Sequence, residues 1–323
     1  MKKAIVTGGL GFIGSHLCER LLEEGYFVTV IDNEVSSVIG SDFFKSNNIT
    51  VHVDDVFSAL HFLEESDVFF HLASPVGPVG VLDYAGRMGY EILRDVVGII
   101  DYCKRNKSML INISTSEIYG HSDSLDEDSK KVFKEYKVRT EYGASKMVAE
   151  IAINGAALVS SDLRYHTIRP FNVSGPRQKP NGGFVLPRFV VAALTDQPIT
   201  IYGDGLQRRA FTDVKDICNS IFEISVSSYK NEIWNIGNPQ NEMNIRELAW
   251  LVADTVGKGE IISVDPKDIH GDLFSEPGDK VPNSDKISSL LGWKPQVSLE
   301  ETIKSTVEYY ESKIKEGYYF KVI

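Results

Sequence analysis

The sequence is short of cysteine, of positive charge and of long apolar runs, and each shortage excludes a class of protein. Its three cysteines, Cys18, Cys103 and Cys218, are scattered and lack C-x-x-C spacing, which argues against a disulfide framework or a zinc site. Basic residues number 34 against 45 acidic ones, and the net charge of −11 argues against nucleic acid or an anionic membrane as the main partner. No apolar run approaches the ~18 residues of a membrane span, and the run in MKKAIVTGG ends too soon for a signal peptide. We therefore expect a cytoplasmic globular protein, in which a local arginine cluster can still bind a small anion.

Short apolar runs alternate with helical patterns through the first half of the chain. This alternation predicts an α/β fold, a Rossmann-type doubly wound parallel sheet. The runs expected to form strands are 3–7, 26–31, 49–53, 67–72, 109–113 and 165–168, and the expected helices are 15–24, 90–105 and 142–159. After residue 170, glycine and proline crowd the sequence, and amphipathic patterns follow at 245–256 and 299–314. We expect an NAD-binding domain over 1–171, to which 206–236 returns, and a smaller α/β domain for the substrate over 172–205 and 237–323.

A glycine cluster, TGGLGFIG, stands where the first strand ends and a helix begins. Glycines at positions 8, 11 and 14 permit a tight turn and close approach of backbone to a pyrophosphate at the helix N-terminus. Asp32 closes the second strand about 18 residues after Gly14, near the ~20 expected for a carboxylate that accepts both ribose hydroxyls. No Arg or Lys occurs from 33 to 37, which favours NAD over NADP. The residues expected to contact NAD here are Gly8, Gly11, Phe12, Ile13, Gly14, Asp32 and Asn33.

Tyr142 and Lys146 stand at i and i+4 of an expected helix and therefore share one face. Alone, such a pair is usually a packed tyrosine beside a lysine whose aliphatic stem is buried. Beside a dinucleotide fold, a tyrosinate can take a hydroxyl proton while NAD takes the hydride from the same carbon. The tyrosine pKa of ~10 would have to fall by about three units, which one ammonium at ~4 Å could supply at an effective dielectric of ~20. Thr115, at the tip of the fifth expected strand, can hydrogen-bond the same substrate oxygen.

Seven motifs in order resemble the extended short-chain dehydrogenase/reductase superfamily, in its nucleotide-sugar epimerase, dehydratase and decarboxylase branch. They are TGGLGFIG, the step 54–56, HLAS at 71–74, STSEIYG at 114–120, the Tyr/Lys pair, RPFNVSGPR at 169–177, and RAF at 209–211. The resemblance covers almost the whole chain and implies bound NAD, a nucleoside-diphosphate sugar, UDP first among them, and transient oxidation at sugar C4. Further NAD contacts that it implies are Asp55, Val56, Leu72, Ala73 and Ser74. The implied contacts to the nucleotide and its diphosphate are Asn172, Arg177, Leu186, Arg188, Tyr202 and Arg209, since guanidinium groups suit that dianion.

The stretch STSEIYG distinguishes the members of this branch. Epimerases are similar to SSSAxVYG and dehydratases to STDEVYG, whereas Thr115-Ser116-Glu117 together with Arg139 resembles the UDP-glucuronate decarboxylases. We expect Thr115, Ser116, Glu117, Tyr142 and Lys146 to be catalytic, with Tyr142 and Lys146 also contacting NAD. We expect the reaction to be decarboxylation of UDP-glucuronate to UDP-xylose or its 4-keto form. A 4-epimerase and a 4,6-dehydratase remain open.

Three features of the sequence depart from the pattern of that branch. Lys280 stands where the decarboxylases carry an arginine, and Glu276 stands where related epimerases carry one. The usual Asn and Gly-Thr of the helix before the fifth strand are replaced around Ile92, Asp95 and Val96. An unusual sugar would be consistent with these changes.

Apolar outer positions on the helices 90–105 and 142–159 bear on assembly. Val97, Ile100, Ile151 and Ile153 are such positions, and in the family these helices pair two subunits through a four-helix bundle. Packing within one subunit explains much of the same pattern. A different class of function, an NAD-binding sensor or scaffold without catalysis, would most often have lost Tyr142, Lys146 or the Thr115 hydroxyl, and all three are present.

Overall fold

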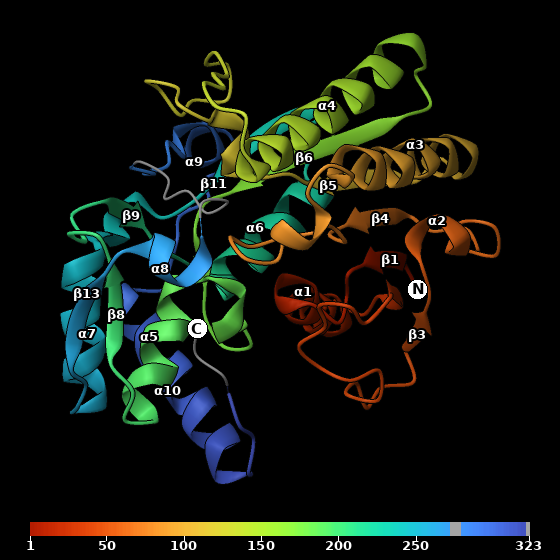
Figure 1. Cartoon of the computed structure of the whole chain (residues 1–323). Coiled ribbons are helices and arrows are strands. Elements are labelled where there is room, and N and C mark those ends of the chain that lie inside the picture. The colour runs from red at the N-terminus through yellow and green to blue at the C-terminus, as the bar shows by residue number, and fades with distance from the viewer. Residues whose placement is uncertain (272–278, 321–323) are drawn as a thin grey trace.

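A seven-stranded parallel sheet forms the centre of the protein in a computed structural model, which describes residues 1–271 and 279–320 (Figure 1). The strand order is β11-β6-β5-β4-β1-β2-β3, and every neighbouring pair is parallel. The strands are β1 (Lys3–Thr7), β2 (Phe27–Asp32), β3 (Ile49–Val53), β4 (Val68–His71), β5 (Met109–Ile113), β6 (Arg164–Pro170) and β11 (Glu232–Ile236). The predicted doubly wound sheet is confirmed.

Alternate side chains of these strands pack into two cores, one on each face of the sheet. Ala4 and Val6 of β1 enter the core beneath α1 and α6, whereas Ile5 between them enters the core beneath α2, α3 and α4. The helices are α1 (Phe12–Glu23), α2 (Val56–Ala59), α3 (Met88–Asn106), α4 (Val138–Val159) and α6 (Val214–Val226). Because both faces are covered, the strands read as continuous apolar runs, which made them visible in the sequence.

A third core lies among helices and short strands of the second half of the chain, on the left in Figure 1. Its helices are α5 (Val185–Leu194), α7 (Ile245–Val256) and α10 (Leu299–Lys315), and a parallel pair, β8 (Ile199–Tyr202) and β13 (Ile261–Val264), packs with them. Capping boxes, Asn244 with Glu247 and Ser298 with Glu301, begin α7 and α10 where the sequence predicts helices. The exact domain boundaries remain a prediction.

The remaining elements are short and lie around the carboxyl end of the sheet or on the surface. They are β7 (Val173–Ser174), β9 (Arg208–Ala210), β10 (Thr212–Asp213), β12 (Glu242–Asn244), α8 (Pro266–His270), α9 (Asp285–Leu291) and the 3-10 turns η1 (Leu82–Tyr84), η2 (Ser116–Tyr119), η3 (Pro180–Gly182) and η4 (Pro239–Asn241). The three cysteines are buried free thiols. Within the described part of the chain, no helix is both long and apolar enough to cross a membrane.

Candidate active site

The glycine turn lies at the carboxyl end of β1, beside the point where the strand order reverses between β1 and β4. Gly8 has a φ of +71°, and its amide donates to the Ile31 carbonyl oxygen at 2.8 Å. A Cβ on Gly14 would lie 2.1 Å from the Gly8 oxygen, so that position accepts glycine only. Gly11 caps α1 without a side chain, which leaves the amides of the first turn facing the site. These features fit a pyrophosphate.

A methyl group at Gly14 tests this packing. We expect Gly14→Ala to lower the free energy of unfolding by about 1–3 kcal/mol, the usual cost of overpacking, and to weaken NAD binding. Gly155→Ala is the control, because its added Cβ meets no heavy atom within 4 Å and α-helices gain about 0.5–1 kcal/mol from this change. Thermal unfolding with and without NAD gives both quantities. Equal stability of the two variants would contradict the close packing described here.

Asp32 lies at the end of β2 and is buried. Its Oδ2 accepts the Leu10 amide at 3.0 Å, and its Oδ1 accepts the Glu34 amide and the Ser37 hydroxyl, each at 2.9 Å. A carboxylate accepts about four hydrogen bonds, so about one position remains for a ribose hydroxyl. The sequence predicts two such bonds, but three hydrogen bonds to the carboxylate already fix the glycine turn and the loop after β2.

Thr7 and His71 join the ends of β1 and β4 at the switch point. The Thr7 hydroxyl accepts the amides of Leu72 and Ala73, each at 3.2 Å, and lies 2.9 Å from His71 Nδ1. Burial, with a smaller contribution from Lys146, lowers the pKa of His71 to about 3, so the imidazole is neutral. Leu72 and Ala73 therefore lie against Gly8. Thr7 was not among the site residues predicted from the sequence.

The other expected cofactor residues lie near the ends of β2, β3 and β4. Asp55 caps α2 and accepts Arg94 Nη2 at 2.6 Å, while Val56 is buried. The Asn33 side chain accepts the Val35 amide at 3.2 Å, and the Ser74 hydroxyl donates to the Pro75 oxygen at 3.2 Å. Each polar group thus also stabilises its own loop.

The hydroxyls of STSEIYG have different partners at the tip of β5. The Ser114 hydroxyl donates to the Glu150 carboxylate. Thr115 Oγ1 accepts the Glu117 amide at 3.1 Å and hydrogen-bonds the Tyr142 phenol. Ser116 is buried at the start of η2. The structure therefore brings the strand tip and the Tyr/Lys helix, α4, together.

Tyr142 and Lys146 are both buried in the described structure. Burial raises the pKa of Tyr142 above its ordinary value, although the Thr115 hydrogen bond opposes the shift. Lys146 donates to the Ile113 oxygen at 3.0 Å, and burial lowers its pKa to about 8 against the attraction of Glu150 and Asp95. The sequence predicts that Lys146 lowers the pKa of Tyr142, but in this structure the ammonium donates to the Ile113 carbonyl oxygen.

Glu117 forms the centre of a cluster with Arg139 and Lys280. Arg139 binds it with two hydrogen bonds, Nε to Oε2 and Nη2 to Oε1, each 2.6 Å long. Lys280 Nζ also pairs with Oε1. Burial opposes the charge of Glu117, but Lys280 and Arg139 more than offset it and hold the pKa of this carboxyl well below its usual range. Glu117 is therefore a carboxylate at any pH at which the protein would work.

A cavity of about 120 Å³ opens beside this cluster. Three arginines, Arg139, Arg188 and Arg209, line it together with Asn172, Tyr202 and Phe184. The Arg188 guanidinium lies 4.2 Å from the centre of the Tyr202 ring. A cavity lined by guanidinium groups suits a diphosphate.

Two of the expected substrate residues lie elsewhere. Arg177 has a left-handed backbone, with φ of +71°, and its guanidinium pairs with Glu19 of α1 at 2.8 Å and lies over the Phe43 ring. Leu186 is fully buried in the third core. Neither residue lines the cavity. Glu276 lies outside the described residues.

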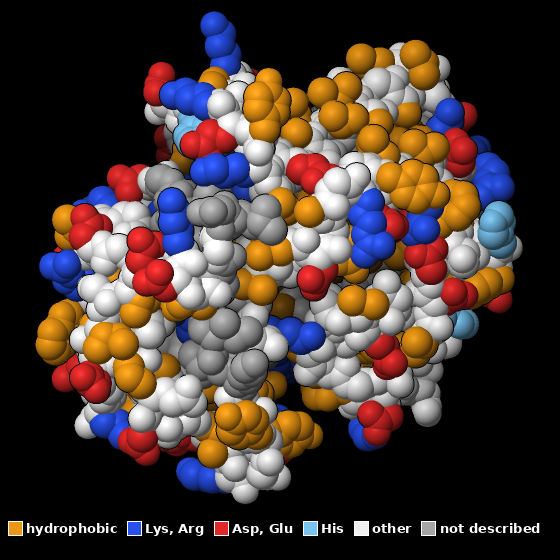
Figure 2. Space-filling model, in the orientation of Figure 1, with side chains coloured by type: hydrophobic (Ala, Val, Ile, Leu, Met, Phe, Trp, Pro, Cys, Tyr) orange, Lys and Arg blue, Asp and Glu red, His pale blue; other side chains and the backbone are white. Residues whose placement is uncertain are grey.

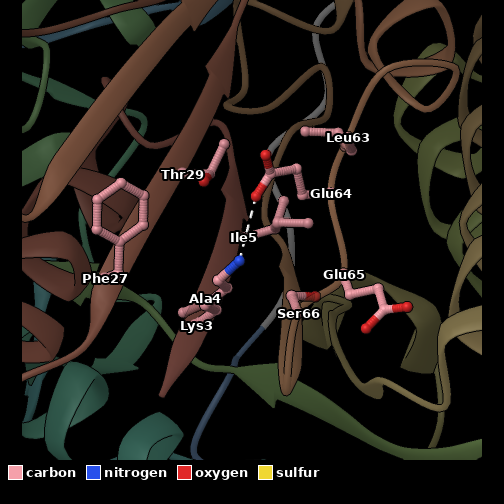
Figure 3. Close-up of a pocket in the computed structure, with 9 residues that line it drawn as sticks. All are labelled: Lys3, Ala4, Ile5, Phe27, Thr29, Leu63, Glu64, Glu65 and Ser66. Atoms are coloured by element: carbon pink, nitrogen blue, oxygen red, sulfur yellow. Dashed lines mark hydrogen bonds and ion pairs between the residues drawn. The ribbon is translucent and has the colours of Figure 1, made fainter. Parts of the chain in front are cut away.

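A second, smaller hollow of about 30 Å³ lies at the opposite end of the strands (Figure 3). Lys3, Phe27 and Ser66 are among its lining residues, and an ion pair of 3.1 Å joins Lys3 to Glu64 across it. It lies at the amino ends of β1 and β2, whereas ligands of open α/β sheets bind at the carboxyl ends. It has no part in the site.

A model of the NAD-dependent epimerase/dehydratase family matches residues 4–237. The chain therefore belongs to this family, and the resemblance stated from its motifs is confirmed. It is an enzyme of the class that acts on nucleotide sugars, and NAD is its cofactor.

Individual relatives carry several activities. The chain is 32% identical to UDP-glucuronic acid decarboxylase 1 of Xenopus tropicalis, over 97% of this chain and 73% of the relative. It is 31% identical to the UDP-N-acetyl-alpha-D-glucosaminuronate decarboxylase of Bacillus cytotoxicus, over 96% and 98% of the two chains. Among solved structures, the UDP-glucuronic acid 4-epimerase of Bacillus cereus, in complex with UDP-glucuronic acid and NAD, is 26% identical and superposes with a TM-score of 0.82 over 98% and 100%.

Proposed function

We propose that this protein decarboxylates a UDP-linked hexuronate after transient oxidation at sugar C4. The observation that carries the proposal is the Glu117–Arg139–Lys280 cluster, which lies directly beside the Thr115–Tyr142 pair. A site for a neutral sugar has no need of a buried ammonium there. Two of the relatives described above are decarboxylases of UDP-linked uronates, which supports the same conclusion.

The surroundings of Lys280 favour an additional anion. Burial lowers the pKa of Lys280 to about 8, with Glu117 opposing this shift and Arg139 and Arg209 adding to it. A substrate carboxylate beside the ammonium would reverse part of that shift, because an opposite charge stabilises the charged form. Lys280, at the position where the decarboxylases carry an arginine, thus keeps a cation paired with Glu117.

The reaction divides among the residues as follows. Tyr142, hydrogen-bonded to Thr115, would receive the proton of the C4 hydroxyl as the tyrosinate. NAD held at the glycine turn would supply the acceptor for the hydride of C4. The product is a β-keto carboxylate, from which the C5–C6 bond breaks, CO₂ leaves and the electron pair moves into the C4 carbonyl. A proton from solvent then adds to C5, and the hydride either returns to C4, giving the pentose, or leaves with the reduced cofactor, giving the 4-keto pentose. Glu117 remains ionised, so its role is to orient Arg139 and Lys280 around the substrate carboxylate, and it does not donate that proton.

A 4-epimerase acting on the same uronate is the second candidate. The Bacillus cereus UDP-glucuronic acid 4-epimerase, with its matching fold and coverage, favours it. A dehydratase has less support, because Ser116 stands where the resemblance places the aspartate of the Asp-Glu pair.

Incubation with NAD and UDP-glucuronate, or with UDP-N-acetylglucosaminuronate, tests the proposal. Released CO₂, NADH absorbance at equilibrium and the mass and NMR spectrum of the sugar product are measured together. Release of CO₂ supports decarboxylation, and persistent NADH identifies a 4-keto product. Inversion at C4 without CO₂ would establish the epimerase instead, and UDP-sugars without a carboxylate are the controls.

We also propose that α3 and α4 pair two subunits. Exposed apolar side chains gather on these helices, as the orange patch over them in Figure 2 shows. They are Tyr90, Val97, Val148, Ile151, Leu158 and Val159. Ile100 and Ile153, also named from the sequence as outer positions, are instead buried within the subunit, in the core that α3 and α4 form against the sheet.

A lysine in this patch should separate the subunits. Ile151 is 60% exposed, so Ile151→Lys costs little within one chain but places a charge in the proposed interface. We expect a monomer by light scattering after gel filtration where the wild type is a dimer. A wild-type monomer, or a dimeric variant, would overturn the interface.

A further inference from the structure

Glu150 is a buried carboxylate that the reaction outlined above does not use. Its side chain is 5% exposed and pairs with Arg169 of β6 through two hydrogen bonds, Nη2 to Oε2 at 2.6 Å and Nε to Oε1 at 3.1 Å. It also accepts the Ser114 hydroxyl. A buried ion pair is a weak source of stability, because desolvation cancels much of the attraction. Stability alone therefore does not explain why a carboxylate is buried at this position.

Three side chains of α4, spaced four residues apart, hold three consecutive residues at the end of β5. Lys146 donates to the Ile113 oxygen at 3.0 Å, Glu150 accepts from Ser114, and Tyr142 hydrogen-bonds Thr115. Residues at i, i+4 and i+8 lie along one face of a helix, which is how one helix can contact a short strand end in this manner. The proposed reaction uses two of these contacts, that of Tyr142 with Thr115 and that of Lys146 with Ile113.

Arg169 extends the same network to the turn that carries Glu117. Its Nη1 donates to the Tyr119 hydroxyl at 2.9 Å and to the Glu127 oxygen at 3.0 Å. Tyr119 in turn donates to Asn235 Oδ1 of β11 at 2.7 Å. Both ends of STSEIYG are thus tied, through one carboxylate and one guanidinium, to α4, β6 and β11.

We propose that Glu150 is a positioning residue for the oxidation step: it holds Ser114, and through it Thr115, in register with Tyr142 and Lys146 on the same helix. Glu150 also supplies negative charge beside Lys146. The other charged or titratable groups that act on Lys146 or face it are Asp95 of α3, itself paired with Arg94, and the neutral His71 of β4. This inference rests on the proposed oxidation at C4, but its structural part can be measured without a substrate.

Two variants of the NAD-bound protein, Ser114→Ala and Glu150→Gln, test this positioning role. Ser114→Ala removes one hydroxyl and leaves the Glu150–Arg169 pair intact, and Ser108→Ala is its matched control. Ser108 is equally buried, precedes the other end of β5 and donates to the Ser66 oxygen at 2.5 Å. We expect kcat to fall about ten- to a hundredfold in Ser114→Ala, the range expected for slight misplacement of reacting groups, with little change in KM, whereas Ser108→Ala keeps the wild-type kcat at a similar loss of stability.

Glu150→Gln gives the charge readout. With the carboxylate neutralised, the Lys146 ammonium loses the attraction that opposes its desolvation, so its pKa should fall below about 8. We expect the alkaline limb of the kcat profile to move to lower pH. A residue with a structural role only would lower the amount of folded protein and leave the shape of the profile unchanged.

Amide hydrogen exchange over residues 113–119 separates this inference from the proposed function. Faster exchange there in Ser114→Ala and Glu150→Gln, but not in Ser108→Ala, supports the positioning role even if UDP-uronates are not turned over. Wild-type exchange in both variants, or wild-type kcat and pH profile in an active enzyme, would overturn it.

Discussion

The Tyr142→Phe variant is expected to bind NAD as tightly as the wild type and to lose turnover by about a hundred- to ten-thousandfold, the contribution typical of a general acid–base group. The phenol is buried and bonded to Thr115, so its removal deletes the proton acceptor for the C4 hydroxyl and little else. NAD binding by calorimetry and kcat with the active UDP-sugar are the two measurements.

Tyr165→Phe is the matched control. Tyr165 is also buried, and its hydroxyl donates to Asn154 Oδ1 at 2.9 Å, away from the site. Its loss should cost about 1 kcal/mol of stability and leave kcat unchanged. Undiminished turnover in Tyr142→Phe would remove the tyrosine from the mechanism, while NAD binding without turnover in the wild type would favour a sensor or scaffold.

The pH dependence of the wild type follows from the same pair. Burial raises the pKa of Tyr142 and lowers that of Lys146 to about 8. Activity should therefore rise with pH as a larger fraction of the phenol is deprotonated. It should fall above about pH 8 as the ammonium groups of Lys146 and of Lys280, whose pKa is also lowered to about 8, are lost. The positive nicotinamide ring of bound NAD would favour the tyrosinate and so oppose the effect of burial on the pKa of Tyr142.

The second large effect is expected for Lys280→Met. This change removes the ammonium from the Glu117 cluster, and losing one member of a buried charge pair costs about 2–5 kcal/mol, or roughly thirty- to several-thousandfold in binding. We expect kcat/KM for the UDP-uronate to fall by that factor. Lys280→Arg, which keeps the charge, should retain most of the activity.

UDP-glucose binding is the control for this prediction, because that ligand has the diphosphate but lacks the carboxylate. Its Kd, measured by calorimetry, should change little in Lys280→Met. If UDP-glucose and UDP-glucuronate weaken by the same factor, Lys280 serves the diphosphate and the argument for a uronate loses its main support.

The sheet was predictable because its central strands, such as β1, β4 and β5, are buried on both faces, and the edge strand β3 is still apolar enough to be recognised. The runs 3–7, 49–53 and 109–113 match β1, β3 and β5 residue for residue. The helix predicted from 142 begins four residues earlier, at Val138, since no breaker precedes it. That difference matters, because it places Arg139 on the first turn of α4, one turn before Tyr142.

The site was only partly predictable, since its ion pairs join distant segments. Nothing local in the sequence brings Lys280 to Glu117 or Arg169 to Glu150. A backbone bridge to Arg209 places Lys280, and the packing of α4 against β6 places Glu150 beside Arg169. Arg177 shows the opposite failure: its motif suggested a substrate contact, but a left-handed backbone turns the side chain toward Glu19. A preceding glycine and proline, Gly175-Pro176, were the available signal of a turn.

The hydrogen bonds of the Asn172 side chain join parts of the site that are synthesised at different times. Its Nδ2 donates to the oxygens of Ala210 and Lys280, each at 3.2 Å, so the lysine is attached to the rest of the site through backbone that is synthesised late. The glycine turn, Tyr142 and Glu117 all leave the ribosome well before it. A nascent chain can therefore form its glycine turn first, and Lys280, the cation proposed to bind the sugar carboxylate, is added only shortly before the final helices are translated.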